Sequence, residues 1–392
     1  MSDTAHLERR RLHWGWYLGA VIGLIVVATG LRLGFVELRY RQLVAQLEQR
    51  GFDVGTSSWL DATFPDDDRF SQWVRKNIHG ISLKGVSVSD NPRSRITCND
   101  DDLKAICELF TLAWRGDHTR FYNSLSLLYT SVSDRGLSHL KSLSQLGTLA
   151  IESKLVSDVG LDSLNGLPNL RYLDIESPQI TDIGLRHLQG LGKLEHLRLN
   201  RRLITDAGMV HLRGLVNLQV LQLNKTNVTG LGISELKDLT KLTRLGLNQT
   251  CIGDDGFSTL AKFVKLEILV LQHTRITDAS LVHLGKLTEL NALDLSHTPI
   301  TGAGMANLSG LTNLEALFLS GSQMTDAGLE HIVQMKKLSV LRLSKTHVTD
   351  VGILQLAPCK ELTDLDVSHT AVTAEGIAQL KRSVPDLKVR LR

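Results

Sequence analysis

Histidine and cysteine are the side chains of this 392-residue chain with the most versatile chemistry, since they bind metal ions and serve as bases or nucleophiles. His273 and His297 occupy equivalent positions in LVLQHTRIT and LDLSHTPIT. We expect their rings to lie within about 5 Å of each other on neighbouring strands. A metal ion would need a third ligand. The equivalent flanking residues, Gln249 and Gly321, offer none, so the sequence predicts no metal site.

A second set of histidines shares one position of a recurring GLxHL-like motif, at His139, His187, His211, His283 and His331. Ser163, Glu235 and Thr259 fill the same position in other copies. This variation indicates a solvated helix face.

Cysteines and catalytic motifs give no stronger signal. The four cysteines include no CxxC pair; Cys98 and Cys107 could form a disulfide in an oxidising compartment, or all four could remain separate thiols. No phosphate-binding glycine loop, HExxH or GxSxG motif occurs. The net charge is only +3, with acids and bases mixed. We therefore predict no catalytic residues, no cofactor and no nucleic-acid partner.

The elements that would position any site come from one repeated unit. The stretch LNALDLSHTPITGAGMANLSGL, from Leu290 to Leu311, recurs every 24 residues from Tyr122 to Val372, in eleven copies. In the copy that starts at Leu311, alternation of Leu317 and Leu319 predicts a short strand, and Thr325 and Asp326 predict the start of a helix. Gly328 recurs in ten copies, with Ser280 the exception, and we expect it to allow close approach of helix to sheet.

These units predict an α/β solenoid with a parallel sheet on its concave side and short helices on its convex side. A hydroxyl residue follows each strand in eight of eleven copies, and we expect it to satisfy backbone groups of successive loops. Lys154, Pro178 and Arg202 interrupt this column, and we expect those turns to be looser.

The repeat L-x-x-L-x-L-(S/N)-x-T followed by VTDVGI, ITDIGL or MTDAGL resembles the 24-residue leucine-rich repeat proteins of planctomycete-type bacteria. In that group an arginine-flanked membrane segment, a short helix ending in glycine and a tryptophan-containing cap often precede the repeats. The segments RRRLHWGWYLGAVIGLIVVATG, LVAQLEQRG and SSWL match that layout. The resemblance implies the solenoid fold and an N-terminal membrane anchor.

Composition near the N-terminus also predicts the anchor. WGWYLGAVIGLIVVATGL, residues 14–31, contains no charge and as a helix would span roughly 27 Å. Arginines 9–11 precede it, so we expect a cytoplasmic tail, a single-pass inner-membrane helix and repeats outside the cytoplasm. Arg32, Arg39 and Arg41 oppose this orientation, and a cleaved signal peptide is the alternative.

Association between two copies is a further hypothesis. Gly15, Gly19 and Gly23 form a small-residue stripe that suits helix–helix contact in a membrane. Val36, Tyr40, Leu43 and Leu47 then form a two-heptad seam, which is too short to be stable alone. The expected organisation is a tail at 1–13, a transmembrane helix at 14–34, a juxtamembrane helix at 35–51, an N-terminal cap at 52–121, repeats at 122–376 and a C-terminal capping helix and strand at 377–392.

The concave face is where a repeat protein can vary without losing its core. Two outward-facing strand columns contain an apolar patch, with polar residues at its border. We expect this patch to be exposed and to bind a protein or peptide. Its candidate residues are Arg244, Ile268, Val270, His273, Ala292, Asp294, His297, Ala316, Phe318 and Arg342. In the same columns, Asp174 with Arg198 and Arg342 with Asp366 are expected to form charge pairs.

The sequence thus predicts a membrane-anchored, non-catalytic repeat scaffold for protein–protein interaction. The alternative is a structural cell-envelope protein that acts by self-association and has no dedicated ligand.

Overall fold

The computed structural model describes residues 39, 42, 43, 45, 46, 49, 86–89, 98–115 and 123–392. The predicted tail 1–13 and membrane helix 14–34, with its glycine stripe, lie outside these residues. No helix in the described part of the chain is long and apolar enough to cross a membrane.

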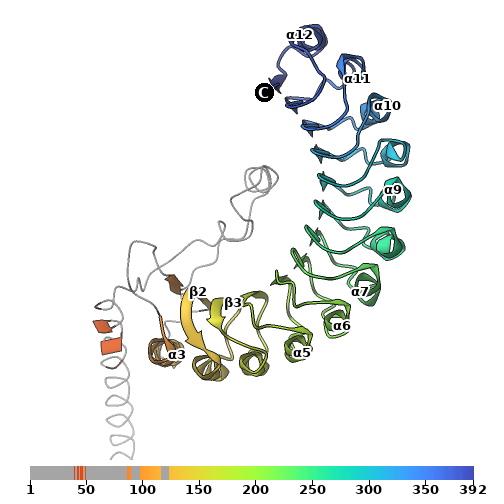
Figure 1. Ribbon diagram of the computed structural model, residues 1–392. Coiled ribbons are helices and arrows are strands. Elements are labelled where there is room, and N and C mark those ends of the chain that lie inside the picture. The colour runs from red at the N-terminus through yellow and green to blue at the C-terminus, as the bar shows by residue number, and fades with distance from the viewer. Residues whose placement is uncertain are drawn as a thin grey trace, which may run out of the picture.

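The strands form one thirteen-stranded parallel sheet whose spatial order is the order of the sequence. Figure 1 shows the sheet bent into an arc, with the strands on its inner side and the helices outside. This confirms the predicted parallel solenoid. The strands are β1 (Val86–Ser89), β2 (Ser124–Ser133), β3 (Thr148–Leu155), β4 (Tyr172–Glu176), β5 (His196–Leu199), β6 (Val220–Gln222), β7 (Arg244–Gly246), β8 (Ile268–Val270), β9 (Ala292–Asp294), β10 (Ala316–Phe318), β11 (Val340–Arg342), β12 (Asp364–Asp366) and β13 (Lys388–Arg390).

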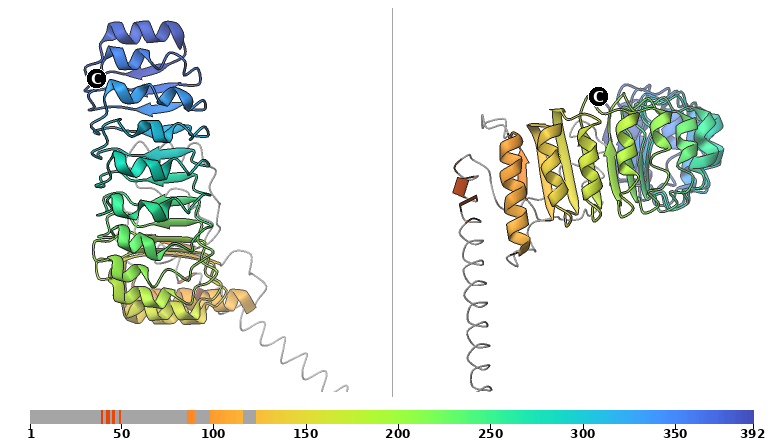
Figure 2. Two further views of the ribbon diagram at one scale, coloured as in Figure 1. Left: turned by 90° about the vertical axis from the view of Figure 1, so that its right-hand side faces the viewer. Right: turned by 90° about the horizontal axis from the view of Figure 1, so that it is seen from below.

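A row of helices covers the outer face of the sheet (Figure 2, left). Those within the repeats are one or two turns long, because each unit has only 24 residues for a strand, two turns and a helix. The α-helices are α3 (Asp100–Arg115), α4 (Asp134–Leu137), α5 (Asp182–Leu185), α6 (Asp206–Met209), α7 (Gly230–Glu235), α8 (Phe257–Leu260), α9 (Asp278–Leu284), α10 (Asp326–Leu329), α11 (Asp350–Leu354) and α12 (Ala374–Ser383). The 3-10 helices are η1 (Ser138–Ser142), η2 (Gly160–Gly166), η3 (Arg186–Leu188), η4 (Asp254–Gly256), η5 (Met305–Leu308) and η6 (Ile332–Gln334).

The core lies between sheet and helices. In one representative copy Leu314, Leu317, Leu319, Leu329 and Ile332 are all fully buried. They belong to a single apolar cluster that runs through the solenoid from Leu103 in α3 to Leu387 before β13. Burying each such side chain contributes roughly 1.5–3 kcal/mol. Stability is therefore spread along the stack rather than concentrated in one centre.

A ladder of carboxylates joins neighbouring repeats. Asp158 Oδ1 accepts the Thr181 backbone N–H at 2.8 Å, and its Oδ2 accepts the Thr181 hydroxyl at 2.6 Å. Thr181 then caps α5 by accepting the Ile183 N–H at 3.2 Å. The same arrangement recurs with Asp182 and Thr205 and with Asp326 and Thr349. The capping threonines are thus held by the aspartate of the preceding repeat.

The hydroxyl column acts within each loop, and the expected bonding between successive loops is wrong. Thr226, Thr250, Thr274 and Thr298 each donate to the carbonyl oxygen three residues earlier, at 2.6–2.7 Å. The hydroxyl therefore closes its own turn, which is the short route for a side chain of this length.

Where the column is interrupted, a different hydroxyl takes over. Ser153 Oγ donates to the Val132 carbonyl oxygen at 2.6 Å, and Ser177 Oγ to the Val156 carbonyl oxygen at 2.5 Å. β3 also extends to Leu155. In the second and third copies the turn is thus replaced by a longer strand tied to the previous repeat, so the looser turns expected there are not seen.

Helix α3 closes the N-terminal end of the core. Asn99 Oδ1 accepts the backbone N–H groups of Asp101 and Asp102 at 3.0 and 3.1 Å, which confirms the predicted cap. Ile106 and Phe110 are fully buried. All four cysteines, including the buried Cys98 and Cys107, are free thiols.

The predicted juxtamembrane helix contacts this cap. Residues 39, 42, 43, 45, 46 and 49 are helical. Arg39 forms two hydrogen bonds with the Glu108 carboxylate, at 2.8 and 3.0 Å, and only 1% of the Leu43 surface is exposed. Leu43 belongs to the solenoid core and is unavailable to the dimerising seam to which the sequence assigned it.

Helix α12 and strand β13 close the C-terminal end. Helix α12 begins at Ala374, slightly before the predicted boundary at 377, with Thr373 as its cap. Strand β13 pairs with β12 in register, as predicted, and exposes Lys388 and Arg390 at the sheet edge. Charged side chains there protect an unpaired edge from pairing with another chain.

Candidate binding surface

The candidate residues on strands form two columns on the inner face of the sheet. Ile268, Ala292, Ala316 and Val340 lie opposite one another on β8 to β11, and Val270, Asp294, Phe318 and Arg342 form the next column. Arg244 on β7 is in register with Ile268. The predicted columns are therefore brought together as the 24-residue spacing requires.

The apolar members form a cluster separate from the solenoid core. It consists of Ile268, Val270, Ala292, Ala316, Phe318 and Val340, and we call it the inner cluster. The expectation of an exposed patch is wrong: Val270 is 9% exposed and Phe318 only 4%. Register pairing places each side chain about 4.8 Å from its two neighbours in the sheet, and this lateral contact removes surface from water.

Polar residues border the inner cluster. Asp294 is buried, and its Oδ1 accepts the Ser296 N–H at 2.8 Å. Arg244 is half-buried, and burial lowers the pKa of its guanidinium while Glu267 opposes that shift. The border is therefore polar and partly desolvated, as at the rim of many protein interfaces.

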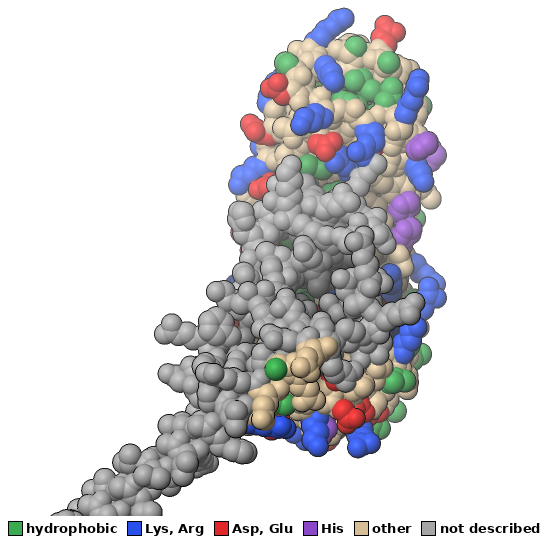
Figure 3. Space-filling view, turned by 90° about the vertical axis from the view of Figure 1, so that its left-hand side faces the viewer, with side chains coloured by type: hydrophobic (Ala, Val, Ile, Leu, Met, Phe, Trp, Pro, Cys, Tyr) green, Lys and Arg blue, Asp and Glu red, His purple; other side chains and the backbone are tan. Residues whose placement is uncertain are grey.

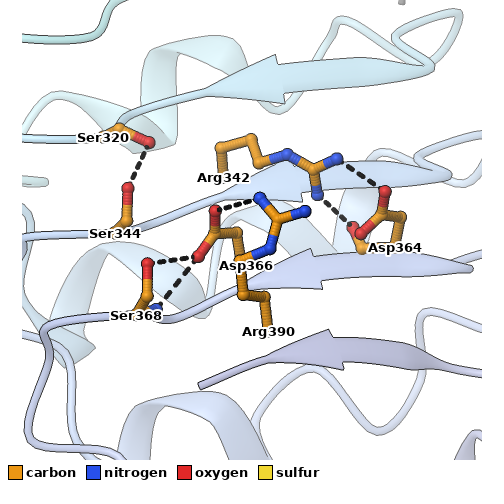
Figure 4. Close-up of polar contacts among 7 residues, drawn as sticks. All are labelled: Ser320, Arg342, Ser344, Asp364, Asp366, Ser368 and Arg390. Atoms are coloured by element: carbon orange, nitrogen blue, oxygen red, sulfur yellow. Dashed lines mark hydrogen bonds and ion pairs between the residues drawn. The ribbon is translucent and has the colours of Figure 1, made fainter. Parts of the chain in front are cut away.

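Arg342 pairs with a different carboxylate from the one expected. Its Nη2 donates to Asp364 Oδ2 at 2.6 Å, and its Nη1 to the Asp364 carbonyl oxygen at 3.3 Å (Figure 4). Asp366 instead accepts from the Ser368 N–H and hydroxyl, at 3.0 and 2.7 Å, and from Arg390 at 3.5 Å. The predicted Arg342–Asp366 pair is wrong because a long arginine side chain reaches the diagonal neighbour.

The other predicted pair is confirmed, within a group of carboxylates near the N-terminal end. Arg198 Nη1 lies 3.3 Å from Asp174 Oδ2, and Arg201 Nη2 lies 2.8 Å from Glu176 Oε1. Burial raises the pKa of Asp174 to about 6 against the effect of Arg198. Burial and the nearby Glu176 raise the pKa of Glu152 to about 7.

His273 and His297 lie in the loops after β8 and β9, beyond the strands that carry the inner cluster. Their rings stack with centroids 4.3 Å apart and planes 3° from parallel, which confirms the expected proximity. Partial burial and the neighbouring His273 and Lys345 lower the pKa of His297. Within the described residues, no group of three histidine, cysteine or acidic side chains is placed to hold a metal ion.

Sequence reasoning missed Val340 as a member of the inner cluster. The signal was present, because Val340 follows Ala316 by one 24-residue period and pairs with it in register. Asp364 was also missed, since its role depends on the reach of Arg342 rather than on a column.

Comparison with known proteins agrees with this architecture. A model of the leucine rich repeat family matches residues 144–204 and 264–324. An internalin (inlF) from Listeria monocytogenes has a TM-score of 0.59 and 21% identity over 79% of this chain and 86% of its own. Internalin C2 (inlC2) from the same organism has a TM-score of 0.43 and 28% identity over 53% of this chain and 84% of its own. No curated protein matches the chain in sequence.

The matched repeats, the parallel sheet and the fold shared with the first internalin identify residues 123–392 as a leucine-rich repeat solenoid.

Proposed function

We propose that this chain is a non-catalytic scaffold that binds a protein or peptide on the inner face of its sheet. The observation that supports the proposal is the inner cluster, which lies on a face that the solenoid core does not need. Leucine-rich repeat solenoids are extended binding scaffolds, and their concave surface is the one they generally use.

The partner would contact the border of the cluster as well as its apolar centre. Val270 and Val340 retain some exposed surface, and Arg244 and Asp364 beside them are half-buried. An apolar centre within a polar rim concentrates binding energy while the rim fixes orientation.

A photo-crosslinking experiment tests the proposal without disturbing the buried cluster. A photoreactive amino acid replaces Arg244 or Asp364, and the same amino acid at Val282, exposed on α9, is the control. The proposal expects a covalent adduct with a different protein from the two inner positions and none from Val282. Adducts with a second copy of the chain would instead support the structural alternative, in which the array self-associates.

We also propose that residues 14–34 anchor the chain in the cytoplasmic membrane, with the repeats outside the cytoplasm. The uncharged run and the preceding arginines support this placement. A membrane-impermeant maleimide applied to intact cells should label Cys251, which is half-buried in a repeat loop. Labelling only after cell lysis would contradict the orientation.

A further inference from the structure

One edge of the solenoid has charge of a single sign. The eight loops that follow β5 to β12 occupy residues 200–204, 224–228, 248–252, 272–276, 296–300, 320–324, 344–348 and 368–372, and we call them the basic edge. They contain no aspartate or glutamate. Their cationic or protonatable residues are Arg201, Arg202, Lys225, Arg275, Lys345, His273, His297, His347 and His369. Figure 3 shows such side chains gathered along one margin of the inner face.

The backbone of these loops turns one residue of each outward in a left-handed conformation. Lys225, Gln249, His273, Lys345 and their equivalents have φ of 55–60°. Glycine adopts such φ values without strain, yet among the loops after β6 to β12 only Gly321 uses it. The main-chain N–H of each residue is used by the fold, as when Gln249 donates to the Gln272 carbonyl oxygen at 2.8 Å. These side chains are therefore not required for the turns.

An open pocket of about 370 Å³ lies within the basic edge. Its lining consists of Arg202, Gln249, Thr250, Cys251, His273 and Arg275, with no acidic residue among them. Arg202 and Arg275 are exposed, and neither guanidinium forms an ion pair or hydrogen bond with any described residue. The stack with His297 fixes the ring of His273 at the pocket wall.

Two unpaired guanidinium groups across a pocket suit an oxyanion, because each can donate two parallel N–H bonds to it. The Gln249 amide adds a group that can bond a hydroxyl. Cations continue along the edge in both directions, to Arg201 and to Lys345. A ligand that matches this arrangement carries repeated anionic groups together with hydroxyls.

We propose that the basic edge binds a linear acidic polysaccharide, with one of its sulfate or carboxylate groups held between Arg202 and Arg275. Nucleic acid fits less well, since none of the eight loops contains an aromatic residue on which a base could stack. An acidic peptide fits less well because the loop N–H groups that would pair with its backbone already bond within the sheet.

Binding of heparin to the full-length chain, measured by calorimetry, tests this proposal. Replacing both Arg202 and Arg275 by Ala is expected to weaken heparin binding about tenfold or more, since each charged hydrogen bond contributes roughly 1.5–3 kcal/mol. Replacing Arg213 and Lys237 by Ala removes the same charge from exposed positions outside the edge and should leave binding nearly unchanged.

Cys251 gives a second readout inside the pocket, independent of the arginine variants. Bound heparin should slow alkylation of its thiol by iodoacetamide, and the R202A/R275A variant should lose this protection. Absence of heparin binding, equal weakening by the control variant, or equal affinity for oligo(dT) or poly-glutamate would overturn the proposal. Substitutions at Arg244 or Asp364 should not alter heparin binding, so this site and the inner face can fail separately.

Discussion

The hydroxyl of Ser280 in α9 donates a hydrogen bond to the Asp254 carboxylate of the preceding repeat. Asp254 also accepts the Thr277 N–H and hydroxyl, at 2.8 and 2.7 Å. Burial raises the pKa of Asp254, but these hydrogen bonds outweigh it and hold the pKa below its ordinary value. Ser280 occupies the position that is glycine in the other ten repeats. The reason for that glycine is therefore the carboxylate, rather than the approach of helix to sheet that the sequence suggested.

Gly184 shows the constraint directly, and Gly184→Ala is expected to destabilise the fold by about 1–3 kcal/mol. A Cβ at this position would overlap Asp158 Oδ1, the oxygen that accepts the Thr181 N–H. Urea denaturation of the two proteins measures the difference.

Gly190→Ala is the matched control for that substitution, because nothing lies within 4 Å of a Cβ added there. A double-mutant cycle with Asp158→Ala then isolates the clash. The cost of Gly184→Ala should shrink once the carboxylate is gone. An unchanged cost would assign it to helix packing instead.

The sequence could predict whatever the 24-residue period determines within a single repeat. Inward leucines, the strand positions and the capping residue of each helix follow from local alternation and spacing, and Leu317 and Thr181 lie as expected. Contacts between repeats could not be predicted in the same way. The overlap of Gly184 with Asp158 joins positions 26 residues apart, and the Arg342–Asp364 pair joins positions 22 apart. Such offsets differ from the period because side chains lean toward a neighbour.

Exposure was the second quantity that the pattern could not supply. Alternation shows that Val270 and Phe318 point away from the core, but their accessible surface depends on what packs beside them. Both belong to an apolar cluster of their own and keep little contact with water.

Thr298→Val should destabilise the solenoid by about 1–2 kcal/mol, because the Leu295 carbonyl oxygen would lose a buried hydroxyl donor 2.6 Å away. Valine has nearly the same shape, so little change in packing accompanies the loss. Thr312→Val, at an exposed turn position, is the control and should be nearly neutral. Thermal melts compare the three proteins, and equal stability of all three would show that the hydroxyl column is dispensable.

Stability should rise as the pH falls from 8 toward 5, because Glu152 and Asp174 have raised pKa values of about 7 and about 6. In that range the unfolded chain keeps these carboxylates ionised, whereas the folded chain takes up protons. The folded state thus gains as protons become available, and the destabilising effect is complete above pH 7.

Glu152→Gln removes the larger of these two shifts and should stabilise the protein at pH 8, on the order of 1 kcal/mol because solvent still reaches the carboxylate. At pH 5 the variant and the parent should be nearly equally stable. Urea denaturation at both pH values measures this, and a stabilisation that is the same at pH 5 would rule out ionisation as its cause.

Thiol reactivity should distinguish Cys251 from the other three cysteines. Cys98, Cys107 and Cys359 are buried, whereas Cys251 is half-buried. Burial, with Cys98 nearby, raises the pKa of Cys107 to about 12, and burial also raises the pKa of Cys359. The thiolate is the reactive form, so at pH 8 a maleimide should modify Cys251 rapidly and the buried thiols only after unfolding. Mass spectrometry counts the adducts, and Cys251→Ser should abolish the rapid one. In urea, without reductant, all four cysteines should react. Protection of Cys98 and Cys107 under those conditions would show that the two are bridged in the isolated protein, because a disulfide survives denaturation whereas burial does not.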